Sequence, residues 1–144
     1  MMPEPPLQPS LPQAGSVPFD VVALVTAAGG LEALSAVLRD LPSPFPAAVI
    51  EAQRLSGNGR TLVHILGRRT TLPVTWMHDG VTLAPGQVWV CPPGHRLELL
   101  PDGTCSLSPH EGGARNRSHD FFLESLADSF GKRALVTARQ ARVP

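Results

Sequence analysis

The chain has 144 residues, a length typical of one domain, and its 12 basic residues are balanced by 12 acidic ones. A neutral chain lacks the basic excess on which dedicated binders of nucleic acids or anionic membranes depend, so the composition argues against both classes. Apolar residues make up 42% of the chain, which is enough to form a buried core.

Proline is the compositional outlier at 16 residues, and six of these prolines fall within residues 1–18, where no apolar periodicity is present. Such a segment cannot bury enough apolar surface to offset the entropy of ordering. We therefore expect residues 1–18 to form a flexible tail and residues 19–144 to form the domain.

The first residues do not have the pattern of a secretory signal, and Val21–Leu31 is too short to cross a bilayer. The sequence therefore predicts a cytoplasmic protein with no membrane insertion. Cys91 and Cys105 lack metal-ligand spacing and are expected to be reduced thiols.

In the first half of the chain, continuous apolar runs alternate with apolar residues spaced three or four apart. The runs are typical of strands buried on both faces, and the spacing is typical of helices with one buried face. The predicted elements, in chain order, are a strand at 21–25, a helix at 31–41, a strand at 47–50, a helix at 62–69 and a strand at 73–76.

The second half begins with a further apolar run at 88–91, which Pro92-Pro93-Gly94 ends. Alternating residues at 97–99 and 105–107, with Pro-Asp-Gly between them, predict a β-hairpin. Phe122, Leu126 and Phe130 form a helical stripe that begins after a possible cap at Ser118 and ends at Gly131. A last strand is expected to start at Ala134.

This order of strands and helices predicts an α/β fold, with a doubly wound, mostly parallel sheet and a β-hairpin insertion. In such sheets, ligands bind at the carboxyl ends of the strands. We therefore expect the functional residues in the turns after the first two strands, at 25–30 and 52–56.

The turn at 25–30 contains Gly29 and Gly30, which allow the backbone to approach a ligand and to present its N–H groups. The G-x-G-x-x-G spacing of dinucleotide sites is absent, which argues against such a site. Two interpretations remain open from spacing alone. The turn could present a nucleophile beside oxyanion-binding N–H groups, or it could be a compact connection without chemistry.

Residues 21–34 read VVALVTAAGGLEAL, which resembles the opening of the catalytic domain of the chemotaxis protein-glutamate methylesterase (CheB) family. Further segments resemble the family in the same order over about residues 19–136, and they include 41–42, 45–49, 53–56, 68–74, 79–86, 88–94 and 118–127. The resemblance implies a domain that hydrolyses methyl esters of receptor glutamates and deamidates receptor glutamines through a Ser-His-Asp triad. It also implies chemotaxis receptors as partners, and no cofactor or metal.

The positions of the family triad carry residues that cannot perform its chemistry. Ala27 stands at the nucleophile's place and has no lone pair for attack, while Arg54 stands at the base's place and cannot accept a proton. The family's Asp comes from a loop after the last predicted strand, and this sequence has no matching segment after Thr137. We therefore predict no methylesterase activity. The expected remnant of the site is the ligand-approach turn, made of Thr26, Ala28, Gly29, Gly30 and Gln53.

A substitute base would have to be a histidine, and His95 is the candidate closest to an expected strand end. His64 is expected to be a surface or packing residue and His78 to be solvated, while His110 and His119 have no partner at metal-ligand spacing. Two further interpretations stay open beside an inactive domain. The fold could serve as a receptor-binding module in which Arg54 pairs with a receptor carboxylate. Alternatively, the sequence could be a truncated or frameshifted gene remnant, with the last part of the sheet missing after 136.

Overall fold

The computed structural model describes residues 20–27, 31–54, 62–109 and 118–139. The predicted tail at 1–18 lies outside the described residues. The elements, in chain order, are β1 (Val21–Ala27), α1 (Leu31–Arg39), β2 (Ala48–Arg54), α2 (Leu62–Gly67), β3 (Val74–Trp76), β4 (Val88–Val90), β5 (His95–Leu99), β6 (Cys105–Pro109), α3 (Ser118–Phe130), the 3-10 helix η1 (Gly131–Arg133) and β7 (Ala134–Arg139).

The main sheet has five strands in the order β3-β4-β2-β1-β7, and every neighbouring pair is parallel. The two central strands, β1 and β2, are apolar along most of their length because helices or the hairpin cover both faces of the sheet. The α/β fold with a parallel sheet, predicted from the alternation of runs and helices, is confirmed.

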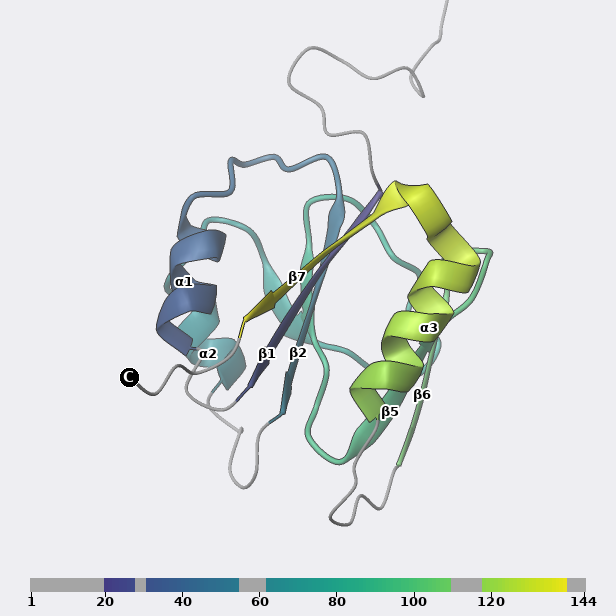
Figure 1. The fold of residues 1–144 in the computed structure, drawn as a ribbon. Coiled ribbons are helices and arrows are strands. Elements are labelled where there is room, and N and C mark those ends of the chain that lie inside the picture. The colour runs from purple at the N-terminus through teal and green to yellow at the C-terminus, as the bar shows by residue number, and fades with distance from the viewer. Residues whose placement is uncertain (1–19, 28–30, 55–61, 110–117, 140–144) are drawn as a thin grey trace, which may run out of the picture.

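One face of the sheet is covered by α1 and α2, and the other by α3 (Figure 1). Leu34 and Leu38 of α1 pack with Leu62 and Leu66 of α2 in the cluster on the first face. On the second face, α3 buries its stripe, with Phe122 and Leu126 each 1% exposed.

The second face also carries the predicted hairpin. β5 and β6 pair antiparallel and form a separate two-stranded sheet, as the alternation of apolar residues indicated. Leu97, Leu99 and Cys105 are buried in the same cluster as the α3 stripe. After α3, the chain passes through Gly131, whose φ of +52° is in the left-handed region, and enters β7.

Several boundaries differ from the prediction, among them those of β1, β2 and α1. β1 continues to Ala27 and β2 to Arg54, so each of the turns expected at 25–30 and 52–56 begins three residues later. Both strands extend because each has a hydrogen-bonded neighbour on both sides over part of its length. The first helix ends at Arg39, and not at Leu41, because its last turn tightens. The Leu41 N–H donates to the Leu38 carbonyl, a spacing of three residues.

Candidate functional site

The carboxyl ends of β1 and β2 bring together the two positions that the sequence singled out. In the parallel register, Ala27 is the Cα partner of Arg54, and Thr26 is the partner of Gln53. These four positions therefore lie side by side at one edge of the sheet, although Ala27 and Arg54 are 27 positions apart in the sequence. The remaining members of the predicted ligand-approach turn, which are Ala28, Gly29 and Gly30, lie outside the described residues.

The third strand at this edge is β7, on the other side of β1. Thr26 is the Cα partner of Arg139, the last residue of β7. Two arginine positions, Arg54 and Arg139, therefore flank the end of β1. Two cationic residues therefore occupy positions at the carboxyl ends of the strands, which is where α/β folds of this class bind their ligands.

Glu51 is a buried acid that the sequence analysis did not single out. It lies in β2 between Ile50 and Ala52, and it is 0% exposed. Its backbone carbonyl accepts a hydrogen bond of 2.8 Å from the Cys91 N–H, just past the end of β4. The signal in the sequence was one acid within the otherwise apolar run at 47–52. Because lone charges are rarely buried without a role or a partner, that signal would have been sufficient to mark it.

The two cysteines are free, as predicted, and they are poor nucleophiles. Burial raises the pKa of Cys91 to about 12, and electrostatic repulsion from Glu51, and from Cys105 when it ionises, adds to this effect. Burial also raises the pKa of Cys105 to about 12. Both thiols therefore stay protonated at neutral pH, where a catalytic cysteine would need the thiolate.

The structure describes the side chains of three histidines, which are His64, His78 and His95. His95 Nδ1 lies 2.9 Å from the carbonyl oxygen of Pro93, in the loop that leads into β5. His64 on α2 and His78 are exposed. His110 lies outside the described residues. His95, the predicted candidate for a ligand contact, thus has a local backbone partner.

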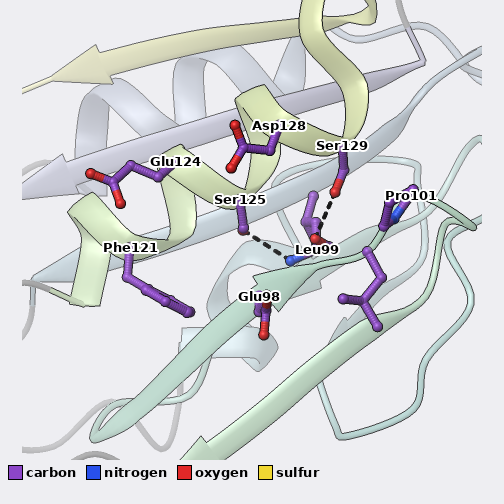
Figure 2. Close-up of a pocket in the computed structure, with 9 residues that line it drawn as sticks. Glu98, Leu99, Pro101, Phe121, Glu124, Ser125, Asp128 and Ser129 are labelled. Atoms are coloured by element: carbon purple, nitrogen blue, oxygen red, sulfur yellow. Dashed lines mark hydrogen bonds between the residues drawn. The ribbon is translucent and has the colours of Figure 1, made fainter.

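A cavity of about 260 Å³ lies between α3 and β5 (Figure 2). Two serines of α3 point from the helix toward β5 and form hydrogen bonds with the backbone of Leu99. The Ser125 hydroxyl accepts from the Leu99 N–H at 3.0 Å and donates to the Phe122 carbonyl at 2.8 Å, while the Ser129 hydroxyl donates to the Leu99 carbonyl at 2.8 Å. Both hydroxyls therefore hold the helix on the hairpin.

Three carboxylates also line this cavity, those of Glu98, Glu124 and Asp128. Within the described residues, no three His, Cys, Asp or Glu side chains are arranged to hold a metal ion. Among the described residues, the cavity thus offers no metal site, and the residues that line it include no histidine.

The CheB methylesterase family model matches residues 22–138, which is most of the chain and includes every strand of the sheet. The chain belongs to the CheB methylesterase family. In the part of the chain that the structure describes, no helix has both the length and the apolar content to cross a membrane.

Individual CheB-family proteins resemble the chain over much of its length. The protein-glutamate methylesterase FrzG of Myxococcus xanthus is 36% identical over 121 residues, covering 82% of this chain and 36% of that protein. The protein-glutamate methylesterase/protein-glutamine glutaminase 3 of Myxococcus xanthus is 34% identical, covering 93% of this chain and 40% of that protein. The chain thus spans about two fifths or less of the length of these curated relatives.

The fold also matches a solved structure of the family. The crystal structure of the Thermotoga maritima CheB methylesterase catalytic domain aligns with a TM-score of 0.73 and 23% sequence identity, covering 85% of this chain and 67% of that one. At this level of identity the likeness establishes the fold. The predicted CheB-type fold is therefore confirmed by the family model and by the structural match.

Proposed function

We propose that this chain is a CheB-type domain that does not hydrolyse glutamate methyl esters. The observation that carries the proposal is the register of β1 and β2, which makes Ala27 and Arg54 neighbours at the carboxyl edge of the sheet. By resemblance, these are the positions of the family's serine and histidine. An alanine methyl group cannot attack an ester, and an arginine cannot take a proton from a nucleophile. The residues needed for acyl transfer are therefore replaced at two adjacent positions.

The direct test is methanol release from methylated chemotaxis receptor fragments incubated with the full chain. The Thermotoga maritima catalytic domain serves as the positive control in the same assay. We expect release by the control and none above a heat-treated blank for this chain, because losing a single member of such a triad already lowers the rate by about 10⁴-fold or more. Release at even a thousandth of the control rate would overturn the proposal.

A second candidate function is binding of a receptor without cleavage, in the cytoplasm. Arg54 supports this candidate, because its position is at the carboxyl end of β2 and arginine is a residue type that pairs with a glutamate carboxylate better than with its methyl ester. The proposed partner is a methyl-accepting chemotaxis receptor. The test compares capture of demethylated receptor fragments by the wild type, by Arg54→Ala and by Arg68→Ala, which removes an exposed arginine at the end of α2. Equal capture by all three would remove this role from Arg54.

The third interpretation, a gene remnant, differs from both in stability. Two buried apolar clusters, one on each face of the sheet, support a chain that folds as a unit. We expect a single cooperative thermal transition in circular dichroism. A gradual loss of signal without a transition would favour the remnant over either functional domain.

A further inference from the structure

We draw no further inference here: the strongest candidate, the cavity between α3 and β5, rests on the acidic cluster of Glu98, Glu124 and Asp128 alone, because its serine hydroxyls already bond the backbone of Leu99 and nothing else among the described residues points to a ligand.

Discussion

The attachment of α3 to the hairpin yields a prediction whose size follows from the hydrogen bonds at Leu99. Leu99 is 1% exposed, so its backbone groups cannot turn to water when the serine hydroxyls are removed. Ser125→Ala leaves the Leu99 N–H without its 3.0 Å acceptor, which costs about 1–3 kcal/mol for a buried donor. Alanine is the better helix former by about 0.5 kcal/mol, which offsets part of that loss. We expect a net loss of about 1.5 kcal/mol in the free energy of unfolding.

Ser129→Ala removes the donor to the Leu99 carbonyl and should cost less, about 0.5–1 kcal/mol, because carbonyl groups tolerate a missing partner better than N–H groups do. The assay is urea unfolding followed by circular dichroism, with a thermal melt in which Ser125→Ala should lower Tm by roughly 4 °C. Ser108→Ala, at an exposed position of β6, is the matched control and should stay within about 0.5 kcal/mol of the wild type. If both α3 variants match this control, the hydroxyls do not hold the helix on the hairpin and the reasoning is refuted.

Three further predictions concern the core, the thiols and one turn. Leu126→Ala, at a position 1% exposed, should lower the free energy of unfolding, measured in urea, by about 2–5 kcal/mol. Leu135→Ala, at a position 42% exposed, should lower it by less than about 1 kcal/mol. Equal losses would contradict the assigned core. The folded-state pKa values of the two cysteines, about 12, lie above the ordinary thiol value of 9.0. The stability that the neutral thiols contribute is therefore present below pH 9 and is lost as the pH rises toward 12. Urea midpoints at pH 8 and pH 10.5 should show this fall, and Cys105→Ala should make it shallower; an unchanged slope would be inconsistent with the burial of that thiol. Gly86→Ala should lower Tm more than Gly80→Ala does. Both glycines have φ above +80°, which strains an alanine, but only a Cβ at Gly86 would also lie 3.3 Å from the Phe45 carbonyl oxygen. The opposite order of Tm values would refute this explanation.

The sequence was sufficient to predict the elements of the fold because each one carries a local periodic signal. The stripe of α3 and the alternation in β5 and β6 are both read from neighbouring residues, and the structure confirms them. The position of β4 between β2 and β3 could not be predicted, because it depends on pairing between segments far apart in the chain. Local patterns also missed the last residues of β1 and β2, whose extension is stabilised by neighbouring strands.

The site was predictable only in part. The expectation that both turns lie at the same end of the sheet required only the fold class. The register that pairs Val21 with Ala48, and so Ala27 with Arg54, is shifted by one residue from the predicted start of the second strand at 47. The burial of Glu51 and the bonds of Ser125 and Ser129 to Leu99 could not be deduced from spacing. Each depends on which element packs against it, which only the three-dimensional arrangement provides.

The pairing of β1 with β7 has a consequence for the synthesis of the chain. Asp20 and Arg133, which join the two strands through an ion pair of 2.7 Å, are 113 positions apart. At roughly 5–20 residues per second, the ribosome completes β7 on the order of ten seconds after β1. During this interval one side of β1 has no strand to pair with, so the nascent protein presents an apolar, half-paired sheet. The time before β7 emerges is therefore when the chain is most exposed to aggregation and most dependent on chaperones.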